Sequence, residues 1–212
     1  MSSPPGTVAR RIARQLARPH GWGGVLLGMA MDAANRRPTT LALDLLAPRA
    51  GERVIDIGCG TGAATARLLA RARCPVDCVD HAPAMLRRAR MRHYPAPGAV
   101  GFHLARLGEL PFDAGSFDTA LALNLLYFCD AQGTMLADLR RVLRPGGRVV
   151  AYVTHRESME RWRFTRAGLH RLFDADGLRA DFGNAGFAED AIAVHERSVA
   201  PGVRGLFALA RA

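Results

Sequence analysis

Two carboxylates flank a run of closely spaced glycines in this chain. Asp56 stands two residues before the run of Gly58, Gly60 and Gly62, and Asp80 follows Gly58 by 22 residues. Glycines at this spacing let the backbone turn tightly and let a ligand approach the main chain closely. A carboxylate about 20 residues further on is where nucleotide-binding α/β folds bind ribose hydroxyls. The pattern therefore predicts a site for a ribose-bearing cofactor.

The spacing of the glycines also favours one class of cofactor over another. Dinucleotide sites use GxGxxG, in which a pyrophosphate sits on the helix N-terminus. Here the spacing is GxGxG, with Asp56 just before it. An acid at this position suits a ligand that carries an ammonium group and repels a pyrophosphate. An NAD(P)-dependent oxidoreductase is therefore the less favoured interpretation.

A strand, a turn and a helix must position these residues. The apolar run 54–57 predicts a buried parallel strand, and the helix-forming residues 63–70 predict the helix that follows the glycines. Residues 74–80 predict a second strand that ends at Asp80. Later in the chain we expect strands over 99–104, 117–123, 148–153, 191–199 and 205–210, and helices over 83–93, 131–144 and about 174–185.

Taken together, the motifs resemble those of the class I S-adenosylmethionine-dependent methyltransferases. Residues 54–62 resemble motif I of that family, and the likeness continues through 79–86, Leu110-Pro111-Phe112, 116–118 and 141–147. Their order and spacing are similar to the small-molecule branch that includes ubiquinone/menaquinone-type enzymes. The resemblance implies an α/β, Rossmann-like, three-layer sandwich. Its seven-stranded sheet would be mostly parallel, with an antiparallel last strand.

The resemblance also suggests how the chain is divided. We expect residues 1–40 to form an N-terminal helical cap or lid and residues 41–212 to form the cofactor-binding methyltransferase domain. Residues 154–173 are rich in His, Arg and aromatic side chains. Because function concentrates on connections at the carboxyl ends of strands, we expect this segment to roof the substrate pocket.

Roles for individual residues follow from the resemblance. The backbone of 58–62, with Cys59, would cradle the methionine part of S-adenosylmethionine, and Asp56 would orient its ammonium group. Asp80 would bind the two ribose hydroxyls. The residues expected to line the adenine, and then to touch the methionine end and the acceptor, are His81, Met85 and Asn124.

The chain departs from the family pattern near the adenine. The resemblance implies an acid a few residues before Leu110, but Arg106 stands at that place. Arginine has no hydrogen-bond acceptor. We expect Arg106 to stack on the ring or turn to solvent, while the backbone near Leu107 reads the base edge.

The resemblance implies methyl transfer to O, N or C of a small aromatic or apolar molecule. A general base is needed only if the acceptor must lose a proton early. Because imidazole titrates near neutral pH, His155 is the first candidate and His170 the second; the alternative for each is a surface or helix-capping role. The residues expected to shape the substrate pocket are His20, Trp22, Tyr127, Trp162 and Phe164.

Composition leaves other classes open. The net charge is +10, and all 29 basic residues besides histidine are arginine. Such basicity would suit methylation of RNA or another macromolecule, but the arginines are spread along the chain and no RNA-binding module is visible. A non-catalytic protein that keeps the fold is a further alternative.

The four cysteines lack zinc-site spacing and no apolar run reaches membrane-spanning length, so we expect a cytoplasmic protein without a metal.

Overall fold

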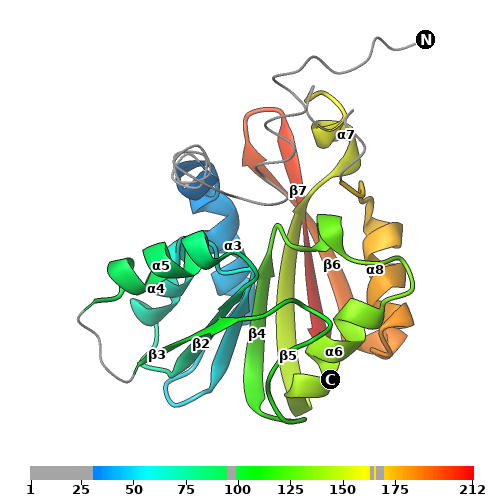
Figure 1. Cartoon of the computed structure of the whole chain (residues 1–212). Helices are drawn as coiled ribbons and strands as arrows, with labels where there is room; N and C mark the ends of the chain where they lie inside the picture. The colour runs from blue at the N-terminus through cyan, green and yellow to red at the C-terminus, as the bar shows by residue number, and fades with distance from the viewer. Residues whose placement is uncertain (1–30, 95–98, 163–164, 166–169) are drawn as a thin grey trace.

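A seven-stranded sheet forms the centre of the computed structural model, in which residues 31–94, 99–162, 165 and 170–212 are described. The strand order is β3-β2-β1-β4-β5-β7-β6 (Figure 1). Strands β1 to β5 pair in parallel, and β7 is antiparallel to both β5 and β6. The predicted mostly parallel sheet with an antiparallel last strand is confirmed.

Helices alternate with the strands through the first two thirds of the described chain. The strands are β1 (Val54–Ile57), β2 (Val76–Asp80), β3 (Val100–Leu104), β4 (Phe117–Leu123), β5 (Leu143–Thr154), β6 (Ile192–Ala200) and β7 (Val203–Arg211). The helices are α3 (Arg36–Leu46), α4 (Ala63–Leu69), α5 (Pro83–Arg92), α6 (Thr134–Val142), α7 (Arg156–Met159) and α8 (Ala175–Asn184). Two short 3-10 turns are η1 (Leu126–Phe128) and η3 (Glu189–Ala191).

The start of β5 differs from the prediction. The helix expected to reach residue 144 ends at Val142, and the strand expected from residue 148 begins at Leu143. Leu143 already pairs with Phe117 of β4, across an irregularity in the register. The backbone N–H of Gly146 also donates to the Ala212 carbonyl at 2.8 Å. Strand pairing with distant segments therefore extends β5 through the Pro-Gly-Gly that stops the helix.

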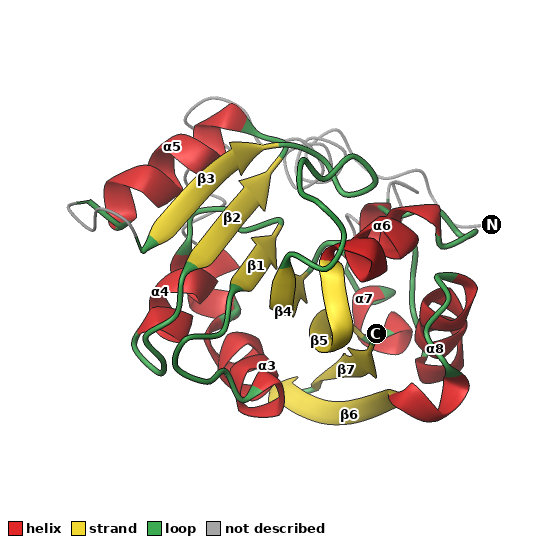
Figure 2. Cartoon of the chain, turned by 90° about the horizontal axis from the view of Figure 1, so that it is seen from below, coloured by secondary structure: helices red, strands yellow, loops and turns green. Residues whose placement is uncertain are grey.

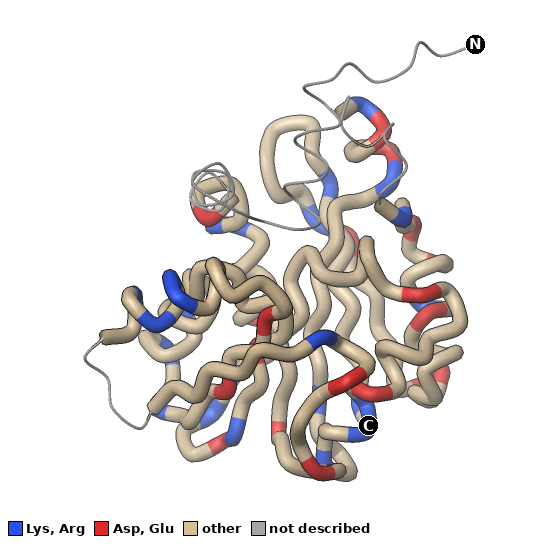
Figure 3. The backbone as a smooth tube through the Cα atoms, viewed as in Figure 1, with Lys and Arg blue, Asp and Glu red and all other residues tan. Residues whose placement is uncertain are grey.

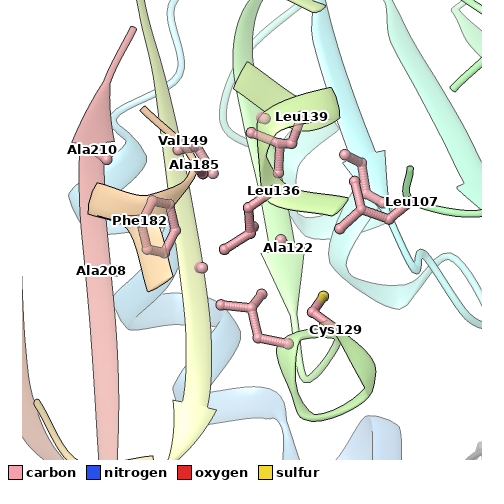
Figure 4. Packing of buried hydrophobic residues seen from close by; sticks show 14 of the residues in the cluster. Leu107, Ala122, Cys129, Leu136, Leu139, Val149, Phe182, Ala185, Ala208 and Ala210 are labelled. Carbon is pink, nitrogen blue, oxygen red and sulfur yellow. The ribbon is translucent and has the colours of Figure 1, made fainter. Parts of the chain in front are cut away.

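Two helical layers cover the sheet (Figure 2). Helices α3, α4 and α5 lie on one face, and α6 and α8 lie on the other. On the second face, Leu136 and Leu139 of α6 and Phe182 of α8 are fully buried near Val149 of β5 (Figure 4). Burying each such side chain contributes about 1.5–3 kcal/mol. The three-layer sandwich is thus held by a separate apolar cluster on each face.

Helix α3 is fixed at its C-terminal end by one arginine. The Arg148 guanidinium donates to the carbonyl oxygens of Leu46 at 2.7 Å and Ala47 at 2.9 Å, and pairs with Glu52 at 2.9 Å. Leu43 and Leu46 are fully buried against the sheet. These contacts orient the N-terminal half of α3 toward the carboxyl ends of the strands. Residues 1–30 of the expected cap lie outside the described residues.

Candidate functional site

A deep pocket opens at the carboxyl ends of β1, β2, β4 and β5. Its volume is about 780 Å³, within the roughly 300–1,000 Å³ that small-molecule sites occupy. One end is formed by the glycine loop after β1 and by the end of β2, and the other by residues after β4 and β5 and by the β6–β7 hairpin. The pocket therefore extends from the glycine loop to the residues that follow β4 and β5.

The three glycines of the loop have different tasks. All have left-handed backbone angles, with φ of 71° at Gly58, 57° at Gly60 and 76° at Gly62. Gly58 and Gly60 line the pocket, and a Cβ at Gly60 would have only the Gly58 carbonyl oxygen within 4.0 Å. Gly62 instead packs against α5, where a Cβ would lie 3.0 Å from Nε2 of His93. Gly62 is not among the described residues that line the pocket, so its place is in shaping the turn.

Asp80 is held rigidly at the end of β2. Its Oδ2 accepts from the N–H of Gly60 at 2.9 Å, and its Oδ1 accepts from the N–H of Ala82 at 2.8 Å. Burial raises the pKa of this carboxyl, and the two N–H donors oppose that rise. Each oxygen keeps a further lone pair. The Asp80 carboxylate therefore anchors the glycine loop and can still accept hydrogen bonds from ligand hydroxyls.

Asp56 lies below the loop at the end of β1 and is 1% exposed. Its Oδ2 accepts from the Thr65 hydroxyl at 2.6 Å. Burial, with a smaller contribution from the charge of Asp80, raises the pKa of Asp56 to about 6. Asp56 forms no ion pair within 4.0 Å among the described residues, and a buried acid without a cationic partner suits a cationic ligand group.

Other predicted cofactor residues divide into two groups. Cys59, His81 and Met85 line the same end of the pocket, with Nδ1 of His81 3.7 Å from Oδ1 of Asp80. A hydrogen bond with the Cys78 thiol and burial raise the pKa of Cys59, so its thiol stays protonated. Arg106 is exposed and Leu107 is buried in the core (Figure 4), and neither is among the described residues that line the pocket.

Asn124 stands where the two ends of the pocket meet. It has a left-handed backbone with φ of 57°, and its Nδ2 donates to Oδ1 of Asn35 at 3.1 Å. The Tyr127 hydroxyl donates to Oδ1 of Asn124 at 3.4 Å and accepts from the N–H of Thr154 at 2.5 Å. Burial raises the pKa of Tyr127, so it remains a neutral phenol. These bonds hold the side-chain amide of Asn124 between the glycine-loop end of the pocket, called the cofactor end below, and the end formed after β4 and β5, called the acceptor end.

The two histidine candidates for a base lie in different places. His155 is buried outside the described pocket lining, and its Nδ1 accepts from the N–H of Glu157 at 3.2 Å as the cap of α7. His170 lines the pocket, with its ring 5.2 Å from that of Phe128 and 6.1 Å from that of Tyr127. Burial lowers the pKa of His170. The helix-capping alternative thus fits His155, and His170 is the better placed of the two.

Trp162 and Tyr127 line the acceptor end of the pocket. His20, Trp22 and Phe164 lie outside the described residues. The described part of the segment 154–173 contributes residues to the pocket wall; these are Thr154, Met159, Arg161, Trp162 and His170.

Asp32 is a pocket residue that the sequence analysis missed. Its carboxylate accepts from the Thr61 hydroxyl at 2.6 Å and pairs with Arg92 of α5 at 2.7 Å. It therefore ties the segment before α3 to the glycine loop. One signal was available, since Asp32 is the first acidic residue of the chain and stands alone until Asp44.

The residues at the cofactor end fit S-adenosylmethionine. Asp80 offers acceptors for a ribose diol, Asp56 offers a carboxyl to an ammonium group, and Gly60 leaves room for close approach. Among the described residues there is no group of three His, Cys, Asp or Glu side chains that would bind a metal. No helix in the same part of the chain is long and apolar enough to cross a membrane.

Part of the chain is similar to known methyltransferase sequences. Residues 54–147 match the family model described as "Methyltransferase domain". Demethylmenaquinone methyltransferase of Tropheryma whipplei (strain Twist) is 36% identical over 141 residues, which are 66% of this chain and 56% of that protein. 27-O-demethylrifamycin SV methyltransferase of Amycolatopsis mediterranei is 34% identical over 121 residues, 56% of this chain and 44% of that protein. The chain thus spans about half the length of the curated relatives it matches.

Solved structures share the whole fold. One is a Burkholderia thailandensis 1,6-didemethyltoxoflavin-N1-methyltransferase, solved with 1,6-didemethyltoxoflavin and S-adenosylhomocysteine. Its TM-score is 0.70 at 21% identity, and the superposition covers 100% of this chain and 91% of that chain. A Haloferax volcanii complex of the Trm112 methyltransferase activator and a putative methyltransferase has a TM-score of 0.75 at 20% identity, covering 89% and 96%. At these identities the likeness concerns the fold.

Proposed function

We propose that this chain, whose residues 54–147 belong to the methyltransferase-domain family, is a class I S-adenosylmethionine-dependent methyltransferase. Its acceptor is a small aromatic or apolar molecule, methylated at O, N or C. The observation that carries the proposal is the Asp80 carboxylate, which is bonded to the Gly60 N–H and faces the same pocket as the glycine loop. The relatives named above support a small organic acceptor.

The pocket residues would contribute mainly by positioning. S-adenosylmethionine, when bound, would supply an electrophilic methyl group on a positively charged sulfur. Asp80 would bind the ribose hydroxyls, and Asp56 would accept from the ammonium group. Asn124 would contact both ligands beside the point of transfer and leave the line between methyl carbon and acceptor atom open. Holding two reactants in line can supply about 7–11 kcal/mol of the barrier, so this geometry needs little additional catalysis.

His170 would remove a proton where the acceptor has one to lose. Its lowered pKa keeps the imidazole neutral at pH 7, in the form that accepts a proton. Its Nδ1 is buried, so we assign proton acceptance to Nε2. An acceptor hydroxyl would give its proton to Nε2 as its oxygen forms the new bond to the methyl carbon.

Calorimetric titration with S-adenosylmethionine tests the cofactor assignment. Asp80→Ala removes charge-assisted hydrogen bonds worth about 1.5–3 kcal/mol, and we expect affinity to fall by about 10–100-fold. Asp77→Ala is the matched control, because Asp77 lies in the same strand and pairs with Arg53 outside this pocket. Equal affinity in wild type and Asp80→Ala, or no binding by the wild type, would contradict the proposal.

The alternative classes have less support in the structure. Figure 3 shows the basic residues of the described part of the chain scattered along the backbone rather than gathered on one segment, as an RNA-binding stripe would require. The buried acid Asp56 lies beside the glycine loop, where a dinucleotide would place its pyrophosphate. Filter binding to RNA across a salt series should therefore show weak association, and NADPH should leave the melting temperature unchanged.

A further inference from the structure

Among the described residues, Arg161 is the arginine that lines the acceptor end of the pocket. Arg161 follows α7, is exposed, and lines the pocket beside Trp162. Its Nη1 donates to the Gly202 carbonyl in the β6–β7 turn at 3.2 Å. This bond holds the guanidinium at the mouth and leaves most of its five N–H donors available.

Arg161 has no carboxylate of the protein beside it. Neighbouring arginines are paired: Arg156 with Asp174 at 3.3 Å, Arg171 with Asp181 at 2.6 Å, and Arg204 with Glu196 at 2.6 Å. No such pair within 4.0 Å involves Arg161 among the described residues. The residues outside the described ranges contain no Asp or Glu, so none of them can supply a side-chain carboxylate.

Charge is distributed unequally along the pocket. Its three acids, Asp32, Asp56 and Asp80, all lie at the cofactor end, where Arg67 of α4 is the accompanying cation among the described residues. The acceptor end combines Arg161 and an imidazole with apolar and aromatic walls; these are Tyr127, Tyr152, Met159, Trp162, Val199 and Val203. The interior of this end suits an apolar ring system, and its mouth suits an anion.

We propose, on the basis of the methyltransferase function above, that the acceptor is an aromatic acid and that Arg161 binds its carboxylate. The ring lies among the buried side chains of Met159 and Tyr152, and the carboxylate lies at the exposed mouth. A guanidinium matches the planar carboxylate with two parallel hydrogen bonds. Because the mouth is open to water, the carboxylate stays partly hydrated and its desolvation penalty is small.

Paired probes test this assignment. Hydroxy-substituted benzoic, cinnamic and naphthoic acids, each beside its primary amide, are titrated into the protein saturated with S-adenosylhomocysteine. An amide keeps the size of the carboxylate and removes its charge. We expect the best acids to bind at least about tenfold more tightly than their amides, as the loss of one charged hydrogen-bond partner predicts.

Arg161→Gln should abolish this preference and leave S-adenosylhomocysteine affinity unchanged. Arg197→Gln is the matched control, because Arg197 is also an exposed arginine that donates to a carbonyl, that of Glu196 at 3.0 Å, and lies outside the described pocket lining. The proposal is overturned if amides bind as tightly as acids, if no acid in the panel binds, or if the preference survives in Arg161→Gln. Failure of the wild type to bind S-adenosylhomocysteine would instead contradict the methyltransferase assignment.

Discussion

Asp56 and Asp80 lie on neighbouring strands, and burial raises the pKa of both carboxyls. Each is held by a different kind of donor: Asp56 by the Thr65 hydroxyl, and Asp80 by the N–H groups of Gly60 and Ala82. Two buried acids close together disfavour each other's ionisation. A cationic ligand offsets that repulsion, so the two acids together favour the binding of a cation.

This arrangement predicts a pH dependence for cofactor binding. With a pKa of about 6, Asp56 is protonated in the free protein at pH 5 and ionised at pH 7. The ammonium group favours the ionised form, so binding at low pH must release a proton. We expect the association constant for S-adenosylmethionine to fall by about fivefold as the pH decreases from 6 to 5, because the ionised fraction of Asp56 falls by that factor.

Asp56→Asn isolates this effect, because the other groups of the pocket are retained. Calorimetry should show weaker binding at pH 7 and a much smaller change between pH 6 and pH 5. An unchanged slope in the variant would assign the pH dependence to another group.

Residues close in sequence were predictable, and residues brought together by the fold were not. Asp56 and Asp80 stand at fixed distances from the glycine loop, so a local pattern identifies them. Asp32 reaches Thr61 from the segment before α3, and Arg161 reaches Gly202 from beyond β5. Both contacts depend on tertiary packing that no local pattern encodes. The exposed position of Arg106 and the helix-capping position of His155 also result from tertiary packing.

At the scale of elements, the β1–α4 turn combines unusual backbone angles with close packing. Gly62 has a φ of 76°, and α5 lies directly behind it. Gly51 has a φ of 83°, with no atom within 4 Å of an added Cβ. The two positions therefore separate backbone strain from crowding.

We expect Gly51→Ala to lower the free energy of unfolding by about 1–2 kcal/mol, through backbone strain alone. Gly62→Ala should cost about 1–3 kcal/mol more, because the methyl group would displace His93 or Ala89. Urea denaturation measures both variants. Calorimetry should also show weaker cofactor binding for Gly62→Ala only; equal stability of the two variants would indicate that α5 yields without strain.

Most elements follow from local pattern, but their ends depend on partners. Strand β4 begins and ends where apolar alternation predicts, and Asp174 caps α8 through the N–H of Gly177 at 2.8 Å. The early start of β5 depends on pairing with β4 and β7. Pro145-Gly146-Gly147 indicates that α6 must stop, but it does not indicate that β5 has already begun at Leu143.

At the scale of the whole molecule, stability and binding are concentrated at opposite ends of the sheet. Phe117, at the start of β4, is fully buried and packs edge-on against Phe112 with ring centroids 4.9 Å apart. Asn124 directly follows the other end of the same strand. At about 3.3 Å per residue, roughly 20 Å separates Phe117 from the pocket. Independent sites this far apart have additive effects.

Phe117→Leu should therefore lower the free energy of unfolding by about 1–2 kcal/mol without changing the stabilisation by ligand. Bound S-adenosylhomocysteine at 100 times its dissociation constant adds about 2.7 kcal/mol in wild type, and the same increment is expected in Phe117→Leu. In Asp80→Ala the stabilisation by ligand should instead fall by about 1.3–2.3 kcal/mol at that ligand concentration, as a 10–100-fold weaker affinity implies. Thermal unfolding with and without ligand distinguishes the two cases. An increment that falls in Phe117→Leu would mean that packing at the far end of β4 controls the geometry of the glycine loop, and the separation of core from site would be wrong.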